Sequence, residues 1–317
     1  MNQNKNIVLT IVASMLLVIG VFVNDPFGWF DESYQTSDPL MEKLNVDSVE
    51  KITISRGSKS SLVFTKTNED WFVSVGKGTS AKANKSDIEK NLLKFSTMRK
   101  YNEVTSSKEK YTQFEVGDDD FNIEIMGSNN IIIAKLFLGK KGSGTATTLV
   151  RLDKEEEVYS VNGTFRSDWD KSFNQFRDRT ILNFNKENVE SLKFNGKQSY
   201  TINRDKAGWK IKTFGVSKPG NPSTIDPIVS SLSTLVGSSF DIKNPNLIRF
   251  GTVEVTLSSK VNLKLEIFGP GLGKTYIAKS SMLADLISIP EYKVNALFKD
   301  SKGLIQKAAP APAPKKK

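Results

Sequence analysis

The sequence predicts an α+β protein with two duplicated β-rich units, each with antiparallel hairpins and a packed helix, preceded by one transmembrane helix. Two observations predict this fold: an uncharged apolar run follows the N-terminus, and two long stretches repeat one pattern in the same order. We therefore expect six segments along the chain. They are a cytoplasmic tail with the anchor (1–30), a juxtamembrane linker (31–48), a first unit (49–175), a connector (176–188), a second unit (189–305) and a disordered tail (306–317).

The apolar run, IVLTIVASMLLVIGVFV, covers residues 7–23 and contains no charged residue. A run of about 17 residues is at the short end of what spans a bilayer as a helix. Trp29 follows it at a distance where an aromatic side chain can lie at the interface with water. The residues that we expect to anchor the chain in lipid are Ile7, Leu9, Leu16, Leu17, Val23 and Trp29.

Charges on the two sides of the run predict its orientation. Lys5 precedes it, whereas Asp25, Asp31 and Glu32 follow it. Because lysine stays on the cytoplasmic side, we expect a single pass through a bacterial inner (cytoplasmic) membrane, with residues 31–317 on the periplasmic side. A cleaved signal peptide is the alternative, but no clear Ala-x-Ala site follows the run, which favours an uncleaved signal anchor.

The clearest part of the repeat relates residues 49–75 to residues 189–214. Both stretches open with Val-Glu and continue as an alternating strand, a glycine turn and a second strand. Both then place a tryptophan, Trp71 or Trp209, in a third strand. Asn195-Gly196, which lies between two alternating runs, is a strong hairpin signal.

Further matches extend the repeat through each half. Apolar residues at helical spacing follow the third strand in both halves, with Ser86 and Ser223 as the expected helix N-caps. Each half is thus expected to hold about three strands, a helix, about four strands and a second helix. The paired stretches are 86–98 with 223–237, 121–152 with 251–280, and 157–171 with 286–300.

One segment resembles a nucleotide-binding P-loop: FGPGLGKTYI, residues 268–277, which contains Gly273-Lys274-Thr275. A P-loop needs a glycine where Phe268 stands, and it connects a buried strand to a helix. The flanking residues instead alternate as half-buried strands do, and the first half has another loop rich in glycine and lysine, residues 138–148, at the equivalent place. We therefore expect a hairpin turn here and no bound nucleotide.

The composition excludes several kinds of site. The chain has no cysteine and no histidine, which excludes disulfides, thiolate nucleophiles, Ser-His-Asp triads and histidine metal ligands. The formal net charge is +10, but lysine and arginine are spread along the chain and do not form a basic stripe with aromatic residues. We expect no nucleic-acid partner and interpret the excess charge as a solvated surface.

An acidic cluster, Asp118, Asp119 and Asp120, is one candidate for metal binding. An EF-hand loop that starts at Asp118 would need glycine and glutamate where Ile123 and Asn129 stand. We interpret the cluster as an acidic turn before a strand and expect no metal site.

A second charged cluster, Arg177, Asp178 and Arg179, lies in the predicted connector. It is a candidate interaction site, although a structural ion-pair clasp is the interpretation that we favour. The C-terminal run AAPAPAPKKK cannot build a core and is expected to be a disordered tail.

Several elements together resemble the DUF4340 family. They are VEKITI at residues 49–54, the Trp71 strand, LFLGK at 136–140, VYSV at 158–161, and FRDRTIL at 176–182 followed by VESLKF. The resemblance implies an envelope protein with one N-terminal anchor, associated with gliding-motility-type ABC transporter systems beside a permease and a large extracytoplasmic auxiliary protein. It implies no catalytic motif. The chain departs from the family in having GTSAKANKSD where a Pro-Ala-rich loop is usual before the first helix.

We therefore expect a non-enzymatic, membrane-anchored accessory or scaffolding subunit of an ABC-type envelope transport complex, without a cofactor. An envelope carbohydrate- or peptidoglycan-binding module is the alternative. It is suggested by the basic charge, by the C-terminal lysines, and by Trp71, Trp169 and Trp209, which could stack on sugars. The repeated placement of Trp71 and Trp209 indicates packing sites instead. An enzyme, either a P-loop nucleotidase or a carboxylate hydrolase, is the third hypothesis.

Overall fold

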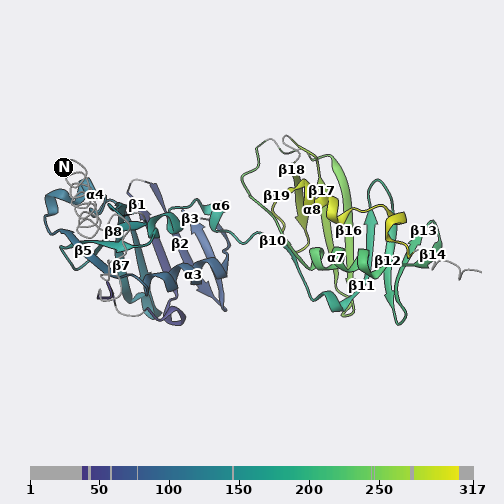
Figure 1. The fold of residues 1–317 in the computed structure, drawn as a ribbon, viewed down its shortest axis with the longest axis horizontal. Coiled ribbons are helices and arrows are strands. Elements are labelled where there is room, and N and C mark those ends of the chain that lie inside the picture. The colour runs from purple at the N-terminus through teal and green to yellow at the C-terminus, as the bar shows by residue number, and fades with distance from the viewer. Residues whose placement is uncertain are drawn as a thin grey trace, which may run out of the picture. The chain divides into compact units, whose positions relative to one another are not determined.

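The computed structural model describes residues 38–306, except 42–43, 58, 77, 145, 244, 246 and 272–274. The chain forms two compact units, residues 1–171 and 172–317, each with one large antiparallel sheet (Figure 1). The predicted β-rich α+β class is thereby confirmed. The predicted anchor and lysine tail lie outside the described residues. Within residues 38–306 as described, no helix is long and apolar enough to cross a membrane.

The first unit contains a sheet of nine strands in the order β4-β3-β2-β1-β6-β7-β8-β9-β5. Its strands are β1 (Lys51–Arg56), β2 (Lys59–Thr67), β3 (Asp70–Val75), β4 (Thr79–Lys82), β5 (Lys100–Thr105), β6 (Phe121–Met126), β7 (Ile132–Lys141), β8 (Thr147–Leu152) and β9 (Val158–Asn162). Its helices are η1 (Val46–Ser48), α3 (Lys85–Phe95), η2 (Lys108–Lys110), α4 (Tyr111–Phe114), η3 (Ser128–Asn130) and α5 (Phe165–Trp169).

The second unit contains a sheet of eight strands in the order β14-β13-β12-β11-β16-β17-β18-β19, and a small sheet of β10 and β15. The strands are β10 (Thr180–Asn183), β11 (Val189–Asn195), β12 (Tyr200–Asp205), β13 (Gly208–Thr213), β14 (Val216–Pro219), β15 (Thr234–Val236), β16 (Arg249–Leu257), β17 (Asn262–Phe268), β18 (Thr275–Ser280) and β19 (Ile287–Pro290). The helices are α6 (Phe173–Phe176), η4 (Lys186–Asn188), α7 (Pro222–Ser233), α8 (Glu291–Leu297) and η6 (Ser301–Leu304).

The two large sheets repeat the same topology. Eight strands of the first sheet, from β4 to β9, follow the same spatial order as the eight strands from β14 to β19 in the second. The repeated tryptophans are Trp71 on β3 and Trp209 on β13. Their backbone carbonyls accept 2.7 Å hydrogen bonds from the backbone N–H groups of Ala83 and Gly220, respectively, which stand just before the helix of each unit. Such equivalence in topology and in local hydrogen bonding supports duplication of one unit.

Two details of the predicted repeat are corrected. A short fourth strand, β4 or β14, stands between the tryptophan strand and the helix, where only three strands were expected. The helix N-caps are Asn84 and Asn221, not Ser86 and Ser223. Each asparagine side chain accepts a backbone N–H from the first turn, as a serine cap would, so the helix begins earlier than predicted.

Each copy also begins before the predicted bounds of 49 and 189. In the first unit, Pro39 forms an antiparallel bridge with Arg99, just after α3. In the second unit, β10 pairs in the same way with β15, just after α7. The described part of the predicted linker, residues 31–48, and the predicted connector, residues 176–188, are therefore equivalent lead segments of their units. Each segment ends in a short 3-10 helix capped by an asparagine, Asn45 or Asn185.

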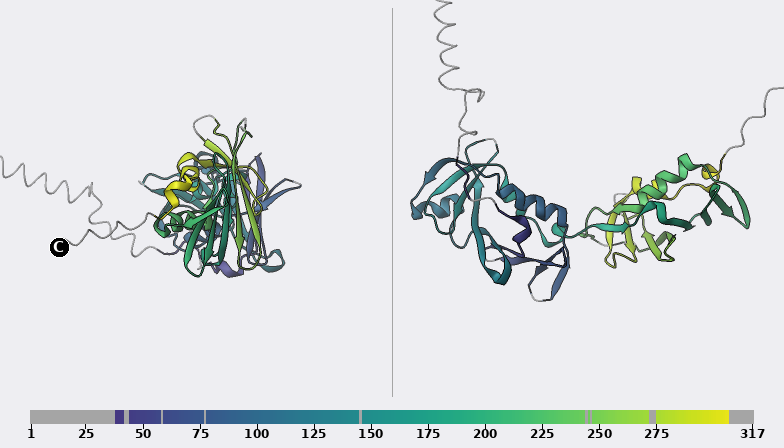
Figure 2. Two further views of the ribbon diagram at one scale, coloured as in Figure 1. Left: turned by 90° about the vertical axis from the view of Figure 1, so that its right-hand side faces the viewer. Right: turned by 90° about the horizontal axis from the view of Figure 1, so that it is seen from below.

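The core of the second unit lies on one face of its sheet. Helices α7 and α8 are on the same side of the strands (Figure 2, left). Alternate residues of the strands point at them, for example Leu192, Val253 and Leu265, each fully buried. This alternation is what an antiparallel sheet with one solvated face requires.

The first unit differs because part of its sheet is covered on both faces. The segment from η2 to residue 120 packs across β7, β8 and β9, where Tyr111, Val116, Phe137, Leu149 and Val158 form a second small core. As a result, β8 is buried at five consecutive residues, Thr147 to Arg151, with no alternation. The equivalent strand of the second unit, β18, keeps exposed residues at Thr275 and Lys279.

Candidate functional site

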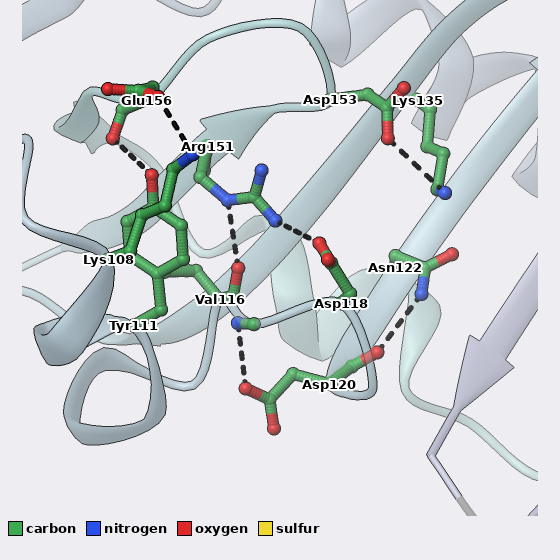
Figure 3. Close-up of polar contacts among 11 residues, drawn as sticks. Lys108, Tyr111, Val116, Asp118, Asp120, Asn122, Lys135, Arg151, Asp153 and Glu156 are labelled. Atoms are coloured by element: carbon green, nitrogen blue, oxygen red, sulfur yellow. Dashed lines mark hydrogen bonds and ion pairs between the residues drawn. The ribbon is translucent and has the colours of Figure 1, made fainter.

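The second layer of the first unit is organised around Arg151, a buried arginine on β8 (Figure 3). Its guanidinium carbon lies 4.0 Å from the ring centre of Phe137 and 4.6 Å from that of Tyr111. Its Nε donates to the carbonyl of Val116 at 3.0 Å and one Nη donates to Asp118 at 2.8 Å. A buried cation needs such partners because desolvation disfavours its charge.

Arg151 thereby holds the acidic turn of residues 118–120 against the sheet. The carboxylate of Asp118 is 88% exposed, so the charge pair is buried on the arginine side only. Asp120 accepts a hydrogen bond from the backbone of Gly117 at 2.8 Å, and its carbonyl accepts one from the Asn122 side chain at 3.1 Å (Figure 3). These contacts give two of the three aspartates a structural role.

A polar hollow of about 320 Å³ lies beside this turn and includes Asp119, Glu124, Thr53 and Lys135 in its lining. Lys135 is already paired with Asp153 at 3.3 Å. Across the described residues, no group of three or more acidic side chains is arranged to hold a metal ion. The hollow therefore offers a solvated acidic surface.

The covering segment is fastened to the sheet by a second contact, between η2 and residue 156. Lys108 and Glu156 pair at 2.8 Å, and the hydroxyl of Tyr111 donates to the carbonyl of Glu156 at 2.6 Å (Figure 3). The hydrogen bond between the two side chains raises the pKa of Lys108 and lowers the pKa of Glu156, so both stay charged. Because the pair is solvent-exposed, its contribution to stability is small.

The structure places Arg177, Asp178 and Arg179 within the second unit, each with its own partner. Arg177 donates to the carboxylate of Asp285, and its guanidinium carbon lies 3.6 Å from the ring centre of Phe240. Asp178 accepts hydrogen bonds from the backbone and hydroxyl of Thr180 at 3.0 and 2.7 Å.

Arg179 completes this set with a 2.9 Å hydrogen bond to the carbonyl of Ser238. Arg177 and Arg179 thus fasten the lead segment of the second unit to Asp285 and to Ser238, whereas Asp178 bonds within the segment, to Thr180.

The P-loop-like segment lies between β17 and β18, which pair as an antiparallel hairpin. Residues 272–274, including Gly273 and Lys274, lie outside the described residues. The chain continues from Thr275 as a strand, whereas a P-loop opens a helix at this point. The strand context therefore matches the hairpin that the sequence predicts.

The three tryptophans within the described residues are core residues. Trp71 and Trp169 are fully buried and Trp209 is 7% exposed, so none presents a face on which a sugar could stack. The repeated pair differs in one contact: Nε1 of Trp209 donates to Asp226 on α7 at 2.7 Å. Nε1 of Trp71 is buried without an acceptor among the described residues.

This difference predicts unequal effects of two matched substitutions. Asp226 stands five residues after the cap of α7, and Glu89 stands five residues after the cap of α3. We expect Asp226→Ala to lower the free energy of unfolding by about 1 kcal/mol, because Trp209 loses its acceptor. Glu89→Ala should change it by less than about 0.5 kcal/mol, since Glu89 makes only a weak surface pair.

Urea unfolding of both variants checks this prediction. Asp226→Asn serves as a second control, because its amide oxygen can still accept the indole N–H. Equal losses for Asp226→Ala and Glu89→Ala would show that the Trp209 hydrogen bond has no measurable role.

An exposed apolar surface that sequence reasoning missed lies at the turn between β13 and β14. Phe214 is 98% exposed and Val216 is 58% exposed. Phe214 and Gly215 both have positive φ, 49° and 83°, and form the two-residue turn of the hairpin. The sequence pattern places Phe214 at the end of the third strand. The signal that could indicate its exposure is a phenylalanine next to Gly215, at a turn position where polar residues are usual.

This hairpin also forms one edge of the second sheet. All four residues of β14 are exposed, and the backbone of Gln306 bonds to Pro219 at the far end of the strand. Among the described residues, no further strand pairs with the outer edge of Val216–Lys218, beside Phe214. The equivalent hairpin of the first unit turns through Gly76 and Gly78 and carries no aromatic residue in its turn.

Comparison with known proteins identifies the family. The sequence model of the family described as a domain of unknown function, DUF4340, matches residues 71–247. The chain belongs to the DUF4340 family. The match starts at the tryptophan strand of the first unit and extends past β15 of the second, so both copies contribute to the family pattern. Neither a curated protein nor a solved structure matches the chain.

Proposed function

We propose that this DUF4340 protein is a membrane-anchored, extracytoplasmic scaffolding subunit of an ABC-type envelope transport complex, in which it binds protein partners and performs no catalysis. The observation that carries the proposal is the outer edge of β14, with which no described strand pairs at Val216–Lys218, together with Phe214 beside it. The outer edge of such a strand can accept a strand of a partner through backbone hydrogen bonds, and an adjacent aromatic side chain supplies apolar area.

The exposure of Phe214 favours a contact with a partner over a role in folding. A phenylalanine that stays in water forgoes about 1.5–3 kcal/mol of burial free energy, which a partner can recover. Aromatic anchors of this kind are typical centres of protein interfaces. The short strand, with Lys218 and Pro219 at its end, limits unspecific pairing of the edge.

Two further arguments support the membrane and transporter parts of the proposal. The run of residues 7–23 has the length and charge asymmetry of a signal anchor. An anchor confines the protein to the membrane surface and so raises its effective concentration near membrane partners. The family resemblance supports a permease and a large extracytoplasmic auxiliary protein as those partners.

The carbohydrate-binding alternative has less support, because Trp71, Trp169 and Trp209 are buried. The basic charge of the chain and its C-terminal lysines remain as arguments for it.

A variant comparison tests the proposed interaction surface. We expect Phe214→Asp to reduce recovery of partner proteins from cross-linked, detergent-solubilised membranes by about tenfold or more, as loss of an interface anchor does. Leu93→Asp is the matched control, because Leu93 is a 55% exposed apolar residue on α3 of the first unit. Quantitative mass spectrometry of the co-purified proteins gives the ratio. Equal recovery with both variants would rule out the β14 hairpin as the contact.

A further inference from the structure

Three consecutive isoleucines are exposed at one end of the first sheet. Ile131, Ile132 and Ile133 are 66%, 57% and 41% exposed. They follow the turn η3 between β6 and β7, and we call them the isoleucine tip. Scattered apolar residues on a surface are ordinary, but a contiguous group of large ones marks a contact surface.

The apolar surface continues from the isoleucine tip to the segment through which the chain enters the unit. A hollow of about 850 Å³ lies between them. Its apolar lining includes Pro39, Leu40, Met41, Leu44, Ile132 and Ile133. The tip and the first described residues of the chain therefore lie on the same side of the first unit.

The register of the sheet places the tip at the end where β1 begins. Lys51, the first residue of β1, pairs with Met126, and Met126 pairs with Ile132. The chain thus reaches the first unit at the same end of the sheet that carries the isoleucines. Residues 24–37, between the predicted span and the described part, reach at most about 50 Å when extended. This end of the unit is consequently the one that the chain tethers to the bilayer, if residues 7–23 span it.

The second unit provides an internal comparison, because it builds the same hairpin with Val261, Asn262 and Leu263 in place of the three isoleucines. Gly127 donates to the carbonyl of Ile131 at 2.9 Å, and Leu257 donates to that of Val261 at 3.0 Å, so the two turns are equivalent. The second copy continues with Asn262 where the first has Ile132. The hairpin therefore forms with a polar residue at this position, and its fold does not require the isoleucine.

Charges around the tip are balanced by ion pairs. Lys135 pairs with Asp153 at 3.3 Å and Glu155 pairs with Lys100 at 3.9 Å. Lys154 adds one positive charge to the lining of the hollow. A surface with paired charges and exposed aliphatic side chains favours insertion into the apolar boundary of a membrane over attraction to anionic headgroups.

We propose that the isoleucine tip inserts into the surface of the bilayer that holds the anchor, as a second membrane contact of the first unit. This inference rests on the proposed function in one respect, the anchoring of residues 7–23. The contact would hold the first unit against the membrane at the end where the chain enters it, instead of leaving the unit free to move within the reach of residues 24–37.

The absence of cysteine allows a direct test, since a single introduced thiol is the only one in the chain. The full-length protein is reconstituted into phosphatidylcholine vesicles, with Ile132→Cys labelled by the environment-sensitive fluorophore NBD. Asn262→Cys, at the equivalent position of the second unit, is the matched control. Lipids that carry a spin label near the headgroup then report contact with the membrane by quenching.

We expect a blue-shifted emission and strong quenching for the label at residue 132, and neither for the label at residue 262. Addition of Ile131→Ser and Ile133→Ser to Ile132→Cys should remove the quenching, while far-UV circular dichroism stays unchanged because all three side chains are exposed. Replacing part of the phosphatidylcholine by phosphatidylglycerol should leave the quenching at residue 132 unchanged.

Two outcomes would overturn the inference, and vesicle flotation distinguishes them. If the protein floats with the vesicles but the label at residue 132 is quenched no more than the label at residue 262, the tip does not contact lipid and the anchor stands. If the protein does not float with the vesicles, the anchoring part of the proposed function fails and the membrane contact of the tip fails with it.

Discussion

Replacement of Trp169 by alanine is expected to lower the free energy of unfolding by about 3–5 kcal/mol, the range for removal of a buried tryptophan. Trp169 lies at the end of α5 and is fully buried. Its ring stacks on Phe95 of α3 with centroids 5.7 Å apart and meets Phe64 of β2 edge-on at 6.2 Å. The indole thus joins both helices to the sheet, and its loss leaves a cavity at their meeting point.

Leu93→Ala is the control for this substitution. Leu93 lies on the same helix, α3, but is 55% exposed, so we expect a change within about 0.5 kcal/mol. Urea unfolding followed by far-UV circular dichroism measures both variants without relying on the indole fluorescence that Trp169→Ala removes. A loss below about 1 kcal/mol for Trp169→Ala would contradict the packing described for the first unit.

Gly139→Ala is expected to be the second strongly destabilising change, with a loss of about 3 kcal/mol at the upper end of the range for overpacking. Gly139 lies in β7, beneath the segment that covers the second face of the sheet. A Cβ atom there would collide with the carbonyl oxygen of Phe114 and would lie 2.7 Å from Cγ1 of Val116. Because one obstacle is backbone, the covering segment itself must move.

The result depends on whether that segment lies against the sheet as described. Gly303→Ala is a suitable control, because no heavy atom lies within 4 Å of the added Cβ. Urea unfolding should show little change for Gly303→Ala and a clear loss for Gly139→Ala. Equal stability of the two variants would mean that β7 is open at Gly139 and that the second layer is not closely packed.

The sequence was sufficient to predict the duplication because local signals occur twice in the same order. Alternating strands, a glycine turn and a tryptophan recur at Trp71 and Trp209, and the structure places both at the start of a third strand. Hairpins connect neighbouring strands, so their pairing follows from local sequence. The P-loop-like segment was interpreted correctly as part of a strand-to-strand connection for the same reason.

Features that depend on contacts distant in sequence were not predicted. Nothing in the local pattern of residues 106–120 indicates that they cover β8, or that Arg151 is buried between Tyr111 and Phe137. The local sequence of the lead segments indicates linkers, because their pairing partners lie 51 to 60 residues further along the chain. The asparagine caps were missed because serine two residues later offers an equally good local signal.

The candidate interaction surface was also beyond the sequence alone. Exposure of Phe214 depends on which side of the β13–β14 turn faces solvent, and a phenylalanine next to a strand is ordinarily a core residue. The isoleucine tip gave a misleading signal in the same way, since three consecutive isoleucines favour a buried strand. Comparison of the two copies in the structure was needed to recognise both features.

The proposed scaffolding function is tested most directly by a pull-down of the full-length protein, cross-linked in intact membranes and solubilised in mild detergent, with mass spectrometry of the co-purified proteins. We predict recovery of a permease and an ATPase of one ABC transporter, together with an extracytoplasmic auxiliary protein. Recovery should depend both on residues 7–23 and on Phe214. Recovery of the protein alone, or with cell-wall fragments only, would contradict a role in a transport complex.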